Sequence, residues 1–135
     1  MRDVESICRE YGLLSVYLFG SRADDGLCRL RGEHVAAAGS DLDIGVFFES
    51  RNVDVDRLAS LQVALEDVFA PLRVDVVPLD RVDPLFQFRA IDGHRVAATE
   101  STAADERELE VMRRAADLLP FQRQAELDLF GVSTS

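Results

Sequence analysis

The sequence predicts an α/β (α+β) fold, in which helices pack on a β-sheet of about four strands. Short runs rich in β-branched and aromatic residues alternate along the chain with longer stretches whose apolar residues recur at helical spacing. The 135 residues fall within the usual length of one domain, and 47% of them are apolar, which is enough to fill a core. We therefore expect residues 1–135 to form a single domain.

The chain is expected to open with a helix and two strands. Asp3 to Tyr11 carries its apolar residues on one helical stripe, and Gly12 follows in a helix-stop position. Leu13 to Phe19 is an apolar run of strand length. After a loop, Ser40 to Phe48 has the alternating, β-branched and aromatic character of a second strand.

The middle of the chain continues this alternation. Asp54 to Ala70 is the clearest helix, because its apolar residues recur at helical spacing and Pro71 ends it. The remaining elements are expected as a strand at Leu72 to Pro78, a helix at Pro84 to Ile91 and an edge strand at His94 to Ala98.

The last part of the chain predicts a helix at Thr102 to Phe130 with a break at Pro120. Its apolar stripe consists of Leu109, Met112, Ala116 and Leu119. This stripe is expected to pack on the core, although its C-terminal end could instead continue into a partner surface. Gly131 to Ser135 is expected to be a loose tail.

Two carboxylates interrupt a strand that otherwise resembles a buried one. Asp41 and Asp43 are two residues apart, so the side-chain period of a strand places them on one face, with Cα atoms roughly 6.6 Å apart. Like charges this close are costly without a cation, and a hard divalent ion such as magnesium is the usual partner. Asp75 interrupts the next valine-rich strand in the same way. It could ligate the same ion, or it could form an ion pair with Arg73.

A Gly-Ser turn ends the first strand. Gly20 permits a tight turn and a close approach to a ligand, while the Ser21 hydroxyl and the following backbone N–H groups can hold phosphate oxygens. Arg22 is either a solvated turn residue or a phosphate clamp. These features predict a triphosphate bound between the turn and the carboxylates.

The order of strand, Gly20-Ser21, spacer, Ser40-Asp41-Leu42-Asp43, helix and strand with Asp75 resembles the pattern of DNA-polymerase-β-like nucleotidyltransferases. It is most similar to the minimal nucleotidyltransferases (MNT proteins). The resemblance implies a palm-like mixed sheet, with a catalytic core over 1–100 and a C-terminal helical extension over 101–130. The last third is similar in style to the MntA antitoxins of HEPN–MNT toxin–antitoxin pairs.

By this resemblance the chain is a magnesium-dependent nucleotidyltransferase that moves AMP from ATP to a hydroxyl group and releases pyrophosphate. The implied catalytic and metal-binding residues are Asp41, Asp43 and Asp75, which would hold two magnesium ions roughly 3.5–4 Å apart. The implied nucleotide-binding residues are Gly20, Ser21, Arg22 and Ser40. The implied acceptor is a tyrosine of a cognate HEPN ribonuclease toxin, which AMP attachment would inactivate.

Two differences from the family keep other functions open. The spacer after the Gly-Ser turn is about twice the family's usual length, so that Leu27 to Val35 reads as an inserted surface loop. Asp24 and Asp25 stand where many members carry a basic residue. One alternative is a non-catalytic antitoxin that neutralises its partner by forming a complex. Another is transfer to a small molecule, as in the related aminoglycoside nucleotidyltransferases.

Composition narrows the choice of partners and compartment. The net charge of −10, without any lysine, disfavours direct binding to nucleic acid, although it suits a basic protein partner or simply good solubility. No apolar run of transmembrane length and no signal-peptide pattern is present, which predicts a cytoplasmic protein. Cys8 and Cys28 do not suggest a disulfide framework. His34 and His94 are expected to be surface histidines.

Overall fold

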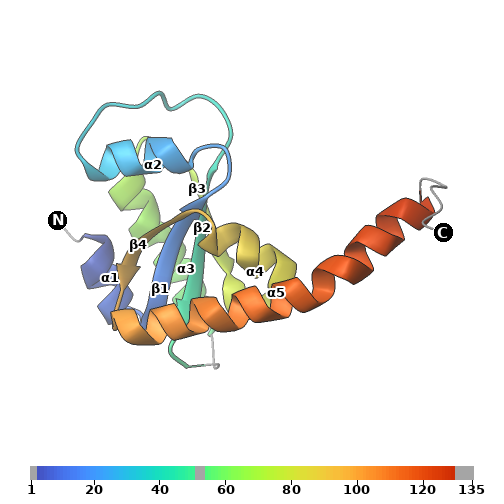
Figure 1. The fold of residues 1–135 in the computed structure, drawn as a ribbon. Helices are drawn as coiled ribbons and strands as arrows, with labels where there is room; N and C mark the ends of the chain where they lie inside the picture. The colour runs from blue at the N-terminus through green and yellow to red at the C-terminus, as the bar shows by residue number, and fades with distance from the viewer. Residues whose placement is uncertain (1–2, 51–53, 130–135) are drawn as a thin grey trace.

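The computed structural model describes residues 3–50 and 54–129. In chain order its elements are α1 (Val4–Glu10), β1 (Leu13–Phe19), α2 (Ala23–Leu30), β2 (Leu42–Phe48), α3 (Val55–Phe69), β3 (Val74–Pro78), the short 3-10 helix η1 (Leu79–Arg81), α4 (Pro84–Ile91), β4 (His94–Ala98) and α5 (Ser101–Leu129) (Figure 1). The predicted α+β fold is confirmed, and α4 and β4 have the bounds that the sequence predicted.

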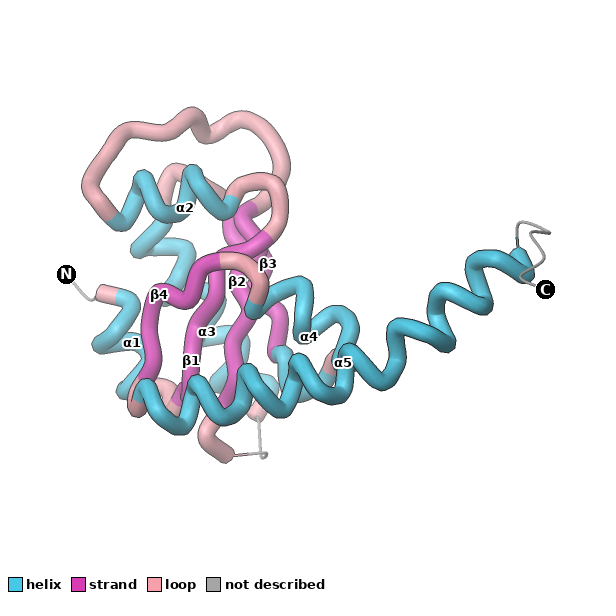
Figure 2. Tube along the Cα trace, in the orientation of Figure 1, coloured by secondary structure: helices cyan, strands magenta, loops and turns pink. Residues whose placement is uncertain are grey.

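The sheet has four strands in the order β3-β2-β1-β4. Strand β1 runs antiparallel to both β2 and β4, whereas β2 and β3 run parallel, so the sheet is mixed. Figure 2 shows the strands in magenta among the cyan helices. A parallel pair requires a crossover connection, which α3 supplies. As a result the N-terminal ends of β2 and β3 lie at the same edge of the sheet as the C-terminal end of β1.

Helices cover both faces of this sheet (Figure 1). On one face, α1 and α3 pack against the even-numbered residues of β2, such as Ile44 and Val46. On the other face, α4 and α5 cover Phe19, Phe47 and their neighbours. Because side chains alternate along a strand, Asp43 projects from the same face as Phe47.

Aspartates cap three of the helices at their N-termini. Asp3 accepts a hydrogen bond from the Ser6 N–H at 2.8 Å, and Asp83 accepts one from the Phe86 N–H at 2.9 Å. Asp54 caps α3 in the same way. Each carboxylate satisfies a backbone donor that the helix itself leaves without a partner.

The expected surface loop after the Gly-Ser turn is partly wrong. Residues 23–30 form α2, which buries Ala23 and Gly26 against the sheet. Leu27 to Val35 is therefore the last turn of α2 followed by a loop, and Val35 at the end of that stretch is only 8% exposed within the core. The pattern was hidden because two of the inward positions of α2 are small residues rather than large apolar ones.

Helix α5 also differs from expectation in two ways. It continues through Pro120 to Leu129, although proline removes one backbone donor from a helix. The stripe expected to be core is exposed, with Leu109 57%, Met112 43% and Leu119 54% accessible and Ala116 also exposed. The buried line of α5 is instead Ala104, Val111 and Ala115. Phe130 and the expected tail, Gly131 to Ser135, lie outside the described residues.

The described part of the chain also bears on the cysteines and on membrane-spanning helices. Cys8 and Cys28 are both free thiols. No helix within residues 3–50 and 54–129 combines the length and the apolar character needed to cross a membrane.

Candidate functional site

The predicted carboxylates meet at one edge of the sheet. Asp43 lies on β2, and its register partners are Asp75 on the parallel strand β3 and Phe19 on the antiparallel strand β1. Asp41 immediately precedes β2, where the Leu42 N–H donates to the Arg73 carbonyl at 2.8 Å and joins the two strand ends. The sheet thus brings together three carboxylates that are as many as 34 positions apart in sequence.

The surroundings of Asp43 disfavour its charged form. Burial raises the pKa of the Asp43 carboxyl above its usual range, and the neighbouring charges of Asp75 and Asp41 raise it further. The Arg89 guanidinium on α4 acts in the opposite direction. The site consequently carries an excess of negative charge, which a bound cation would relieve.

The donor chemistry of this edge fits magnesium, which prefers carboxylate oxygens. In the described part of the chain, however, no three His, Cys, Asp or Glu side chains are already gathered as a metal site. Asp41 instead forms an ion pair with Arg73, whose Nε lies 3.3 Å from Asp41 Oδ1. This is an exposed pair, with 78% of the Arg73 side chain accessible, and such pairs contribute only about 0–1 kcal/mol. Asp41 can therefore exchange Arg73 for a metal ion at little cost.

The same ion pair corrects one alternative drawn from the sequence. Asp75 was a possible partner of Arg73, but the arginine reaches Asp41 across the two strand ends. The cause is the register, because Arg73 lies just before β3 and beside the residue that precedes β2.

The Gly-Ser turn lies directly against Asp43. Gly20 has a φ of +79°, a left-handed conformation that favours glycine, and a Cβ atom there would overlap Asp43 Oδ2. The Ser21 and Ser40 hydroxyl oxygens are 3.0 Å apart, so the turn is hydrogen-bonded to the residue preceding Asp41. Ser21, Ser40 and Gly20 are all exposed and accessible to a ligand.

Arg22 is not a solvated turn residue, because only 9% of it is exposed. Its Nε donates to Asp25 at 2.7 Å, and its two terminal nitrogens donate to the carbonyls of Ala36, Ala38 and Ser40 at 2.6 to 3.1 Å. Four of the five guanidinium N–H groups are thus used within the chain. Arg22 fastens the loop that leads into β2.

Two side chains that were not predicted for the site, Arg89 and His94, also lie near this edge. Arg89 lies in the last turn of α4, and its charge offsets part of the rise in the pKa of Asp43 that burial and the neighbouring carboxylates cause. His94 Nε2 lies 3.2 Å from Asp24 Oδ1 and links the start of β4 to the start of α2. His34 and His94 are both at the surface, as expected. The sequence does show a basic residue, Arg89, in the last turn of the helix before β4. Which way its side chain points depends on how α4 packs on the sheet, and the sequence does not reveal that.

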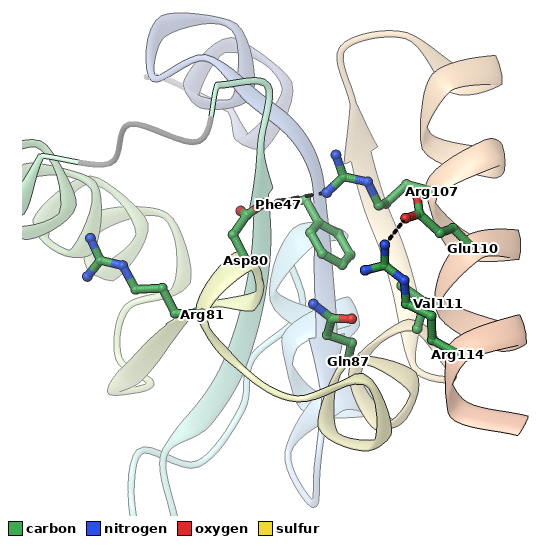
Figure 3. Close-up of a pocket in the computed structure, with 8 residues that line it drawn as sticks. All are labelled: Phe47, Asp80, Arg81, Gln87, Arg107, Glu110, Val111 and Arg114. Atoms are coloured by element: carbon green, nitrogen blue, oxygen red, sulfur yellow. Dashed lines mark hydrogen bonds and ion pairs between the residues drawn. The ribbon is translucent and has the colours of Figure 1, made fainter. Parts of the chain in front are cut away.

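A second cleft lies on the same face of the sheet, toward the other end of β2 (Figure 3). Its volume is about 330 Å³, and it lies between η1, α4 and α5. Phe47 and Gln87 project into it, while Arg107 lies over the Phe47 ring at 5.0 Å and 3.4 Å from Asp80 Oδ1. Arg114 on α5 is paired with Glu110 there. None of the residues predicted for catalysis lines this cleft.

Solved structures share this fold over nearly the whole chain. A double Asp-to-Glu variant of the MntA–HpeT toxin–antitoxin pair contains a chain with a TM-score of 0.66 and 19% identity, covering 93% of each chain. A tri-AMPylated Shewanella oneidensis HEPN toxin in complex with its MNT antitoxin gives a TM-score of 0.62 and 19% identity, covering 93% of this chain and 91% of the other. A toxin–antitoxin structure with AMP-PNP gives a TM-score of 0.64 and 20% identity, covering 93% and 94%.

Sequence comparison supplies the family. No curated protein sequence matches the chain. The profile of the family described as "Polymerase beta, Nucleotidyltransferase" matches residues 2–103, which include β1 with its Gly-Ser turn, β2, β3 and all three carboxylates. The predicted class of enzyme, a nucleotidyltransferase, is confirmed by this match. The chain belongs to the polymerase-β nucleotidyltransferase family.

Proposed function

We propose that the chain transfers AMP from ATP to a protein hydroxyl group, specifically a tyrosine of a HEPN-type toxin, and thereby acts as an antitoxin. The observation that carries this proposal is the register of Asp43 with Asp75, beside a Gly-Ser turn that touches Asp43. Family membership supplies the class of reaction. Similarity to antitoxin chains, one of them in complex with a tri-AMPylated HEPN toxin, supports the choice of acceptor.

In this proposal each residue at the edge has a defined task. Asp41, Asp43 and Asp75 would hold magnesium, which supplies positive charge to the triphosphate and to the attacking oxygen. Gly20 and Ser21 would receive the β- and γ-phosphates through the hydroxyl and backbone N–H groups. Ser40 and Arg22 belong to the nucleotide site chiefly because they hold the turn and the β2 entrance together.

The reaction is a displacement at the α-phosphorus. The acceptor oxygen forms a bond to this phosphorus while the bond to the bridging oxygen of the β-phosphate breaks, and pyrophosphate leaves. The hydroxyl proton passes to Asp75 or through it to solvent, because Asp75 is exposed at the outer strand of the site and can face an acceptor. Positioning of the acceptor by a bound protein would supply much of the rate.

The partner is inferred to be a protein that binds outside the catalytic core. Residues 101–129 form a helix whose second half stands away from the sheet (Figure 1) and whose Leu109 and Met112 are exposed. A chain with a net charge of −10 favours a partner with a basic contact surface.

A non-catalytic antitoxin is the second candidate, and a specific observation favours it. Asp41 is engaged by Arg73, and the described residues hold no ready cluster of three ligands. In that case complex formation alone would neutralise the partner, and the carboxylates would contribute nothing to it.

Co-expression with a HEPN-type toxin separates the two candidates. Intact-mass and peptide mass spectrometry of the HEPN protein should show added AMP on tyrosine with the wild-type chain. The double variant Asp41→Asn with Asp43→Asn should give none, whereas Asp67→Asn, an exposed carboxylate on α3, should behave as wild type. Neutralisation of the toxin without any added AMP would refute the enzymatic proposal and support the binding one.

A further inference from the structure

The last turn of α4 lies against the catalytic edge. Gly93, which follows this helix, fits so closely under β1 that a Cβ atom there would overlap the Leu18 carbonyl oxygen and lie 3.0 Å from Phe19 Cβ. His94 then pairs with Leu18 in the sheet. The end of α4 is therefore fixed next to Phe19, the register partner of Asp43.

Aromatic contacts place Arg89, on the same helix, close to Phe19. The Phe86 ring meets the Phe19 ring edge to face, with centroids 5.8 Å apart. The Arg89 guanidinium lies over the Phe86 ring at 5.6 Å, a geometry that holds an arginine in place without consuming its N–H groups. By way of Phe86 the guanidinium is thus held beside Phe19, the register partner of Asp43. Arg89 itself is exposed and can be approached from solvent.

Two other arginines near this edge have partners within the chain. Arg22 uses four N–H groups on Asp25 and on loop carbonyls, and Arg73 is paired with Asp41. A bound triphosphate carries several negative charges into a site that holds three carboxylates. The proposed magnesium offsets part of this charge, and because the chain has no lysine, a basic side chain that offsets more of it has to be an arginine or a protonated histidine.

We propose that Arg89 is a phosphate-binding residue, whose guanidinium contacts oxygens of the β- or γ-phosphate of the bound nucleoside triphosphate. The inference rests on the proposed nucleotidyl transfer and adds a basic side chain from α4 to a site otherwise built from the strand ends and the Gly-Ser turn. Arginine suits this task because its planar fork can pair with two phosphate oxygens at once.

The test measures how affinity depends on the number of phosphates. The wild-type chain and the variants Arg89→Gln and Arg89→Lys are titrated calorimetrically with AMP-PNP, AMP and inorganic pyrophosphate, each with magnesium. We expect Arg89→Gln to weaken AMP-PNP binding about tenfold to a hundredfold, the usual loss for one charge-assisted hydrogen bond, and AMP binding far less. Arg89→Lys should retain part of the preference for AMP-PNP, because it keeps the charge.

The control is Arg113→Gln, which removes an exposed arginine that lies on α5 and not on α4. It should leave all three affinities unchanged. A pyrophosphate affinity that falls together with that for AMP-PNP assigns the contact to the phosphate chain. Equal weakening of AMP and AMP-PNP, or no weakening of either, overturns the inference, since a merely structural role would not distinguish the ligands. AMP transfer by the wild-type chain is assayed separately, so failure of the proposed function is recognised independently of this comparison.

Discussion

Asp43 is the residue on which the site converges. It touches the Gly-Ser turn on one side, pairs in register with Asp75 on the other and is electrostatically coupled to Arg89. Its raised pKa shows that the fold holds this carboxylate where its charge is unfavourable. Residues kept in such positions are characteristic of functional sites, because stability alone would select a neutral side chain.

Replacing Asp41 and Asp43 by Asn should remove activity without harming the fold. We expect AMP transfer to fall by about a hundredfold or more, because the proposed metal would lose two negatively charged carboxylate ligands. In magnesium-free buffer the melting temperature should hold or rise, because a group whose folded pKa is raised destabilises the fold once it is ionised. Calorimetric melting beside a transfer assay checks both effects. A marked fall in melting temperature would show instead that the carboxylates are structural.

Arg22 contributes through the loop that it fastens. Arg22→Gln should lower the free energy of unfolding by about 2–4 kcal/mol, because a nearly buried guanidinium loses its bonds to Asp25 and to three carbonyls. The matched control is Arg31→Gln in the same segment, whose side chain is 65% exposed and whose nearest carboxylate is 3.9 Å away. That change should stay within about 0.5 kcal/mol. Urea unfolding measures both, and equal effects would contradict the assigned role.

At the scale of elements, sequence pattern predicted those parts whose signals are local. The strands, α3 and α4 were found because apolar periodicity, Asp caps and prolines mark them within a few residues. Helix α2 was missed because it is short, contains Gly26 and buries small residues that carry little apolar signal. The positions of Asp43 and Asp75 at the strand ends were predictable from their strands, whereas Asp41, expected within the second strand, lies just before β2. The hydrogen bonds of Arg22 and the position of the Arg89 side chain were not predictable, because both depend on contacts between segments that are distant in sequence.

Helix α5 shows why periodicity alone can choose the wrong face. Two sets of its residues recur at helical spacing, and the larger side chains belong to the exposed set. Polar contacts determine which face of α5 is buried. The Tyr17 hydroxyl donates to Glu108 at 2.7 Å, and Arg95 binds Glu108 and Asp105 at 2.7 Å each. These contacts turn Val111 and not Met112 toward the sheet.

Substitutions on α5 should therefore separate its two faces. Leu109→Gln combined with Met112→Gln should change the free energy of unfolding by no more than about 0.5 kcal/mol, because both side chains are exposed. Val111→Ala should cost about 1–3 kcal/mol through a cavity beneath the helix. Chemical denaturation of the two variants provides the comparison. A larger loss from the glutamine variant would restore the original assignment of the stripe to the core.

At the scale of the whole molecule, charge controls ligand binding. A chain with a net charge of −10 repels free ATP, and the excess of carboxylates at the sheet edge adds to this repulsion. A divalent ion reverses the sign of the local field. Nucleotide and metal should consequently bind as a unit rather than independently.

Thermal shift measurements test this coupling. At a concentration of a hundred times the dissociation constant, the magnesium complex of AMP-PNP should add about 2.7 kcal/mol to the stability of the chain, seen as a rise of several degrees in melting temperature. AMP-PNP with EDTA and magnesium alone should each produce much less. Additive effects of the two components, in place of a joint one, would argue against a shared site.

The contacts at Ser40 have a consequence for how this protein can vary. Ser21 and Ser40 are 19 positions apart, yet their hydroxyls are bonded, and Arg22 holds the Ser40 carbonyl from the same side. Everything between them, α2 and its following loop, is a segment with its two ends tied together. When the ends of a segment are held together, adding or removing residues between them changes the loop-closure entropy only logarithmically. The hydrogen bonds at the two ends can therefore stay as they are. The distance in space between the Gly-Ser turn and Asp41 is thus set by these hydrogen bonds and not by the number of residues in the segment. Natural or engineered chains can therefore lengthen the segment while the carboxylates and the turn keep their arrangement.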